Sequence, residues 1–284
     1  MTQENNSYET ATGPIDYGFR NDYMFRATLQ KSMKTLKGLV GSMLHINPDD
    51  IQSVEITNPI ILGESIDIKD FILDINVLLN NNTIINLEMQ VNNLFDWTER
   101  SLSYLCRSFD QLNKGQPYAE TKPVIHIGFL DYTLFPEFPE FYATYQLLNL
   151  RNHHLYSDKF TLSVVDLTHI ELATNEDKAY GIDKWASLFK AISWEEIRMA
   201  AKNDEYLMEA TKTLYTLNSD EMIRQQCQAR MDAERHEYLV KKKIEDLTAE
   251  IADKDAEIAD KNVKIADKDA EIAALKAELA SFKK

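Results

Sequence analysis

The chain has 284 residues, of which 44% are hydrophobic, so it is long enough for one sizeable domain and an appendage. Its net charge of −15 argues against non-specific attraction to nucleic acid over a broad surface, because that attraction depends on counterions released by Lys and Arg. Cys106 and Cys227 lack zinc-ligand spacing and indicate a reducing compartment. Without a signal-peptide pattern or a run of ~20 apolar residues, we expect a cytoplasmic protein and no membrane partner.

The first part of the chain is polar and then becomes helical. We expect disorder over residues 1–20, followed by a helix that Asn21 and Asp22 cap and that runs to about Val40. Its apolar stripe consists of Phe25, Leu29, Leu36 and Val40. Its other side is basic and carries Arg26, Lys31, Lys34 and Lys37. This side is either a solvated face or a local site for phosphate contact.

A polar stripe crosses two apolar, strand-length runs at 71–79 and 83–91, after an extended segment or first strand at 51–62. Three consecutive asparagines join the two runs, which predicts a β-hairpin. With the turn centred on Asn81, Asp74 faces Glu88, Asn76 faces Asn86 and Ile72 faces Gln90.

The facing acids of this hairpin need compensation, because like charges opposite each other destabilise a strand pair. A shared divalent cation is the simplest compensation, since the facing Cβ atoms would be about 4.5–5.5 Å apart. The alternative is that the acids lie on a solvated face, and a one-residue slip or a bulge would then separate them.

The remaining pattern predicts an α/β protein with a mixed sheet flanked by helices. We expect a helix from Phe95 to about Asn113, buried strands at 123–130 and 160–167, and a loop-rich segment at 131–159. A helical region follows from about residue 183. The predicted division is a disordered 1–20, a domain at 21–182, a helical extension at 183–236 and a repeat at 237–284.

The tail is a heptad repeat in which one core position holds Ile244, Ile251, Ile258, Ile265, Ile272 and Leu279. The partner core position holds Leu247, Lys254, Lys261, Lys268, Leu275 and Phe282. Its three consecutive lysines weaken a parallel coiled coil, and Glu–Lys pairs four residues apart support a single helix. The tail is therefore either a marginal coiled coil that forms a homodimer or a long charged helix without a partner.

Several segments together resemble the PD-(D/E)xK nuclease superfamily. They are KDFILD (69–74), NLEMQ (86–90), WTERSLSYL (97–105), KGQPY (114–118) and KPVIHI (122–127). The chain is similar in particular to the Rpn family of recombination-promoting nucleases, often described as putative transposases. The resemblance extends over roughly residues 15–235 and implies the restriction-endonuclease-like fold.

The resemblance also implies roles for individual residues. Asp74 and Glu88 would bind Mg²⁺ or Mn²⁺ together with the main-chain carbonyl of Met89. The metal would lower the pKa of a water, orient it towards the scissile phosphorus and neutralise developing charge. Gln90 stands where most of the superfamily has lysine; it can position a water but carries no positive charge. Lys69 is a possible replacement cation.

Further residues have two interpretations each. Arg100 and Tyr104 share one helix face and could contact DNA phosphate, or Arg100 could pair with Asp96 or Glu99. Asp22 could be a third acid or, as we favour, a helix cap. His126, His153, His154 and His169 show no metal-ligand spacing and are interpreted as structural or solvent-facing.

The leading hypothesis is a metal-dependent DNA endonuclease of low sequence specificity, linked to recombination or mobile elements. The alternative is a weakly active or inactive nuclease fold that acts as a coiled-coil-assembled module for DNA or protein interaction.

Overall fold

The computed structural model describes residues 7–60, 62 and 74–282. The chain divides into two compact units, Met1–Glu234 and Arg235–Lys284. Lys69 and the predicted strand residues 71–73, including Ile72, lie outside the described residues. The predicted domain boundaries at 182 and 236 stay predictions.

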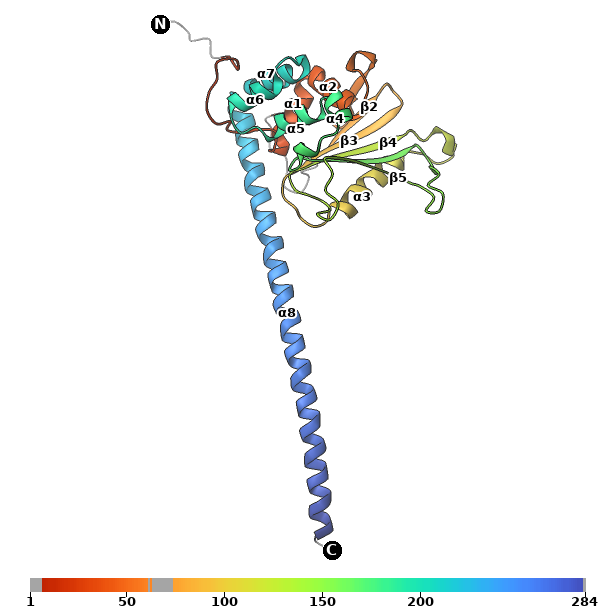
Figure 1. Cartoon of the computed structure of the whole chain (residues 1–284), viewed down its shortest axis with the longest axis vertical. Coiled ribbons are helices and arrows are strands. Elements are labelled where there is room, and N and C mark those ends of the chain that lie inside the picture. The colour runs from red at the N-terminus through yellow and green to blue at the C-terminus, as the bar shows by residue number, and fades with distance from the viewer. Residues whose placement is uncertain (1–6, 61, 63–73, 283–284) are drawn as a thin grey trace. The chain divides into compact units, whose positions relative to one another are not determined.

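The first unit contains a six-stranded mixed sheet in the order β1-β2-β3-β4-β6-β5 (Figure 1). The strands are β1 Val54–Ile56, β2 Ile75–Leu79, β3 Thr83–Gln90, β4 Val124–Leu130, β5 Tyr142–Gln146 and β6 Phe160–Asp166. The central strands β3, β4 and β6 are parallel to one another, and the remaining neighbours are antiparallel. The predicted α/β mixed sheet is confirmed.

The hairpin of β2 and β3 has the predicted register. Ile75 pairs with Leu87 and Asn76 with Asn86, and the turn lies at Asn80 and Asn81. Both turn residues have positive φ, which asparagine tolerates better than most residues. The register, extended by one residue, places Asp74 opposite Glu88, although the paired strand begins at Ile75.

Helices cover both faces of the sheet (Figure 1). The helices of the chain are α1 Asp22–Lys31, α2 Met33–Met43, α3 Trp97–Phe109, α4 Asn175–Ala179, α5 Ile182–Lys190, α6 Trp194–Ala201, α7 Glu205–Asn218 and α8 Glu221–Phe282, and α8 continues into the second unit. The larger core joins one sheet face to α1, α2, α5, α6 and α7. A smaller core under α3 contains Trp97 and Leu105 together with Val124, Leu130, Leu162 and Val164.

The segment predicted as one helix forms two helices, because the helical conformation is interrupted at Ser32. Ser32 has an extended backbone, and its side chain accepts a hydrogen bond from the N–H of Thr35 (3.2 Å), so it caps α2. The expected basic side also changes, because Arg26 is 1% exposed and belongs to the core. The periodicity was continuous across the break, so it carried no sign of the second cap.

Two further segments differ from the expectation. Residues 7–20, expected to be disordered, are held by a bridge from Pro14 to Ser193, and the N–H of Ile15 donates to the carbonyl of Ile192. The segment 131–159, expected to be loop-rich, contains β5, which pairs with β6 as the outermost strand of the sheet. Both differences depend on contacts that are distant in sequence.

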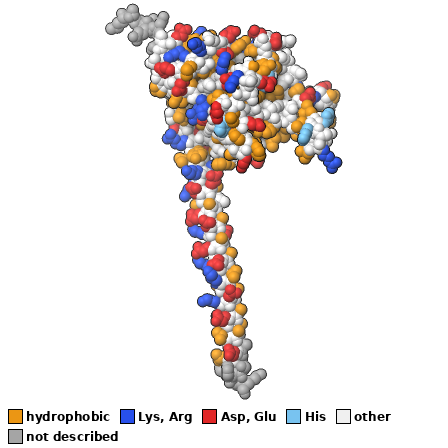
Figure 2. Space-filling view, viewed as in Figure 1, with side chains coloured by type: hydrophobic (Ala, Val, Ile, Leu, Met, Phe, Trp, Pro, Cys, Tyr) orange, Lys and Arg blue, Asp and Glu red, His pale blue; other side chains and the backbone are white. Residues whose placement is uncertain are grey.

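The second unit is the continuation of α8, and its described side chains are largely exposed. Ion pairs four residues apart support the helix: Glu250–Lys254, Glu257–Lys261 and Asp260–Lys264. Figure 2 shows acidic and basic side chains distributed along it with apolar ones between them. None of the helices in the described ranges combines the length and apolar character needed to cross a membrane.

Candidate metal and nucleic-acid site

The site lies where β3 ends. Ile85, Leu87 and Met89 point into the larger core, so Asn86, Glu88 and Gln90 share the opposite face, as the alternation predicts. The buried Met89 side chain leaves only its main chain available to a metal.

Asp74 is held in place through its main chain and one carboxylate oxygen. Its carbonyl accepts hydrogen bonds from the guanidinium of Arg26 and from Asn58 Nδ2 (3.0 Å). Its Oδ2 accepts from Asn86 Nδ2 at 2.5 Å, and Asn86 also donates to Asn76 Oδ1 at 2.7 Å. The other oxygen, Oδ1, is buried and accepts no hydrogen bond from the described residues.

Glu88 is 4% exposed, and Arg100 Nη2 lies 2.8 Å from its Oε1. Burial raises the pKa of Glu88 from 4.5 to about 7, although the charge of Arg100 opposes the shift. The negative charges of Asp74 and Asp22 raise this pKa further. The two predicted carboxylates therefore interact electrostatically, and Asp22 is also close enough to act on Glu88.

Asp22 does not cap α1. The cap is Asn21, whose Oδ1 accepts from the N–H of Met24 at 3.0 Å, because Asp22 already lies in the first turn. Asp22 instead pairs with Arg230 of α8, with 2.7 Å between its Oδ2 and Arg230 Nε. Its burial raises its pKa, while Arg230 lowers it.

The helix α3 forms a wall along the site and contributes the predicted Arg100 and Tyr104. Arg100 pairs with Glu88 and lies 5.7 Å from the ring centroid of Tyr104. Trp97 packs so closely on Gly128 that an added Cβ there would be 2.1 Å from the indole. A glycine beside Glu88 in the next strand thus lets α3 approach the sheet.

His126 belongs to this site, although its spacing in the sequence gave no indication of it. Its Nε2 lies 3.8 Å from Glu88 Oε2, and its ring stacks near Tyr104. It is fully buried, and burial lowers its pKa to about 3, so the imidazole is neutral. Asn86 and His126 are register neighbours of parallel strands, a relation that a lone histidine in the sequence cannot show.

Gln90 ends β3 and is only partly buried. Its Nε2 donates to the carbonyl of Asn92 at 2.9 Å, so the amide turns back to the following loop. Gln90 lies on the same face of the sheet as Glu88, as expected from strand alternation.

The donor set suits a hard divalent cation. Buried oxygens of Asp22, Asp74 and Asn86 accept no hydrogen bond from the described residues, whereas Glu88 Oε1 lies against the Arg100 guanidinium. Magnesium is usually bound by one or two carboxylates and keeps several waters. Within the described ranges, no three His, Cys, Asp or Glu side chains form a metal-holding group, so Asp74 and Glu88 would have to act with waters and main-chain oxygen.

A mixed sheet with acidic residues on a β-hairpin and helices on both faces is the architecture of PD-(D/E)xK nucleases. The family model described as PD-(D/E)XK nuclease family transposase matches residues 15–243, and the chain belongs to this family. Neither the curated proteins nor the solved structures gave a match. The resemblance expected from the sequence is therefore confirmed, and it links the chain to nucleases and mobile elements.

Proposed function

We propose that the protein is a metal-dependent DNA endonuclease of low sequence specificity that acts in recombination or on mobile elements. The observation that carries this proposal is the pair of buried carboxylates, Asp74 and Glu88, at the same end of the sheet, where Asp74 Oδ1 accepts no hydrogen bond from the described residues. Asp74, Glu88 and the Met89 carbonyl would hold Mg²⁺ or Mn²⁺. When bound, such an ion supplies Lewis-acid stabilisation of the charge that develops on the phosphate.

The remaining side chains would bind and orient the DNA. Arg100 and Tyr104 lie on the helix face beside Glu88, where a guanidinium can donate to phosphate oxygens. Gln90 can donate and accept hydrogen bonds but cannot act as a general base near neutral pH. Its contribution would be to orient water or phosphate, and Lys69 remains a candidate cation.

Plasmid nicking tests the proposal. We expect nicking with Mg²⁺ or Mn²⁺, no nicking with EDTA, and a loss of at least about 100-fold in Asp74→Asn and Glu88→Gln, since both remove charge from the proposed ligands. Glu99→Gln is the matched control, because this α3 carboxylate is exposed and bonded to Thr98. Unchanged nicking in the Asp74 and Glu88 variants would refute the assignment.

One observation favours the alternative of a weakly active interaction module. Arg100 already pairs with Glu88, so a metal must compete with a guanidinium for that carboxylate. Isothermal calorimetry separates the two functions: the nuclease requires Mg²⁺ or Mn²⁺ binding that Glu88→Gln weakens, whereas the module requires none.

A further inference from the structure

An ion cluster lies just beyond the end of β4. Asp131 Oδ2 is 2.8 Å from Arg20 Nε, and its Oδ1 is 3.1 Å from Lys190 Nζ. The Asp131 side chain is 8% exposed, whereas Arg20 is 42% and Lys190 36% exposed. The carboxylate is thus covered by two cations that reach the solvent.

This cluster lies at the same end of the sheet as the proposed active site, where β3 and β4 terminate. Because β3 and β4 are parallel and end together, the N–H of Asp131 donates to the carbonyl of Gln90 at 3.0 Å. Arg20 lies two residues before Asp22, whose charge acts on Glu88. Ligands of open α/β sheets commonly bind at the carboxyl ends of parallel strands.

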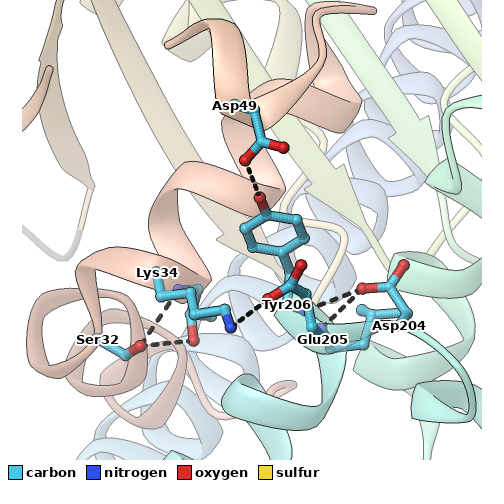
Figure 3. A network of polar contacts seen from close by, with 8 residues as sticks. Ser32, Lys34, Asp49, Asp204, Glu205 and Tyr206 are labelled. Carbon is cyan, nitrogen blue, oxygen red and sulfur yellow. Dashed lines mark hydrogen bonds and ion pairs between the residues drawn. The ribbon is translucent and has the colours of Figure 1, made fainter. Parts of the chain in front are cut away.

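Two of the four residues of the basic side predicted on α1 and α2 are engaged elsewhere. Lys34 Nζ is 2.5 Å from Glu205 Oε2 and belongs to a polar network that joins α2 to the start of α7 (Figure 3). Arg26 is buried and donates to main-chain oxygens. A chain with a net charge of −15 still needs local cations to hold DNA near its acids.

We propose that Arg20 and Lys190 form a phosphate-binding site for the DNA backbone next to the cleaved bond. The proposal rests on the proposed nuclease function and adds to the contacts of Arg100. Two cations around one carboxylate leave a net positive charge that faces the solvent. Because Asp131 already holds the guanidinium of Arg20 and the ammonium of Lys190 in place, the two side chains lose less conformational entropy on binding. Arg20 can donate to two phosphate oxygens, whereas Lys190 supplies a point charge.

The salt dependence of DNA binding tests this site. Anisotropy of a labelled duplex is measured with the full chain in Ca²⁺, at several salt concentrations. Arg20→Gln and Lys190→Gln should each weaken binding several-fold and reduce the slope of log K against log salt by about 1. Lys34→Gln is the matched control, because its exposure of 44% and its single ion pair are similar, and it should bind as the unmodified chain does.

Asp131→Asn separates phosphate binding from a purely structural ion cluster. The amide keeps an acceptor oxygen but removes the negative charge between the cations, so DNA affinity should stay equal or increase. If the cluster only joins the N-terminal segment to α5, all three substitutions change thermal stability and leave DNA affinity and the salt slope unchanged. That result would overturn the proposal.

The nicking assay keeps this test apart from the test of the nuclease itself. Salt-dependent binding that needs Arg20 and Lys190, without nicking, would support the phosphate site and refute the nuclease. Nicking with a salt slope unaffected by either substitution would refute the phosphate site and support the nuclease. An unmodified chain that does not bind DNA would overturn both.

Discussion

Burial determines the protonation of Glu88. The carboxyl is enclosed by β3, β4 and α3, and its pKa of about 7 shows that the partial neutralisation by Arg100 does not offset the loss of hydration. Without a bound metal, the protonated and the ionised forms of Glu88 therefore coexist near pH 7. A bound divalent ion would release this proton, because ligands bind metal in their deprotonated form.

We expect Glu88→Gln to be more stable than the unmodified chain in EDTA at alkaline pH. The folded-state pKa lies above the unfolded one, so stability from the protonated carboxyl is present below about pH 4.5 and is lost as pH rises to about 7. The limiting difference is about 3 kcal/mol. Urea unfolding between pH 5 and 8 measures it, and a difference that does not grow with pH would contradict the assigned burial.

Local pattern and long-range contact contribute differently to the site. The relation of Glu88 to Asp74 and Gln90 follows from strand alternation and one turn, so the sequence predicts it. His126 enters from the next parallel strand after an intervening helix, and Arg20 and Lys190 come from opposite parts of the chain. The spacing of residues along the sequence does not predict such contacts, because they form only when the strands and helices pack together.

Ser32 divides one continuous apolar pattern into two helices. Its hydroxyl accepts from both the N–H and the hydroxyl group of Thr35. Both residues are buried, so the cap is inaccessible to water. Cap preference is local information, but serine is also tolerated within helices, and the uninterrupted hydrophobic period favoured a single helix.

Ser32→Ala should therefore lower the free energy of unfolding by about 1–2 kcal/mol, because an N–H of the first turn of α2 loses its acceptor. Chemical denaturation measures the change. Ser219→Ala is a suitable control, since this exposed residue caps no helix N-terminus and its hydroxyl bonds to the carbonyl of Tyr215. Equal effects of the two substitutions would refute the capping role.

The strand β5 shows why some elements escape a sequence-based prediction. Its five residues are Tyr-Ala-Thr-Tyr-Gln, and they lie in a segment with two prolines and many aromatic residues. On this edge strand only Ala143 is buried, so the apolar alternation is weak. Its pairing with β6 supplies the hydrogen bonds that define it.

The second unit is the part of the chain through which a homodimer is predicted. The described apolar heptad residues are exposed in the single chain; Ile251 is 59% and Ile258 54% exposed. The internal ion pairs stabilise one helix by a few tenths of a kcal/mol each, which does not require a partner. The homodimer through 237–284 therefore stays a prediction.

We predict that the full chain sediments as a dimer and that a chain ending at Glu234 sediments as a monomer. Ile258→Asn should weaken the dimer, because it places an amide at the apolar core position. Ala256→Asn is the matched control on the outer face. Analytical ultracentrifugation provides the masses, and monomers in every case would exclude the tether.

The buried Arg26 gives the acidic edge an internal counter-ion. Its guanidinium donates to main-chain oxygens, including that of Asp74, and its charge also acts on the Asp74 carboxylate. This permanent charge lies beside the residue that precedes β2 and does not depend on a bound ion. The acids can therefore be brought together while the chain folds, before any cation arrives. Binding of the proposed metal would then be a separate event from the assembly of the site.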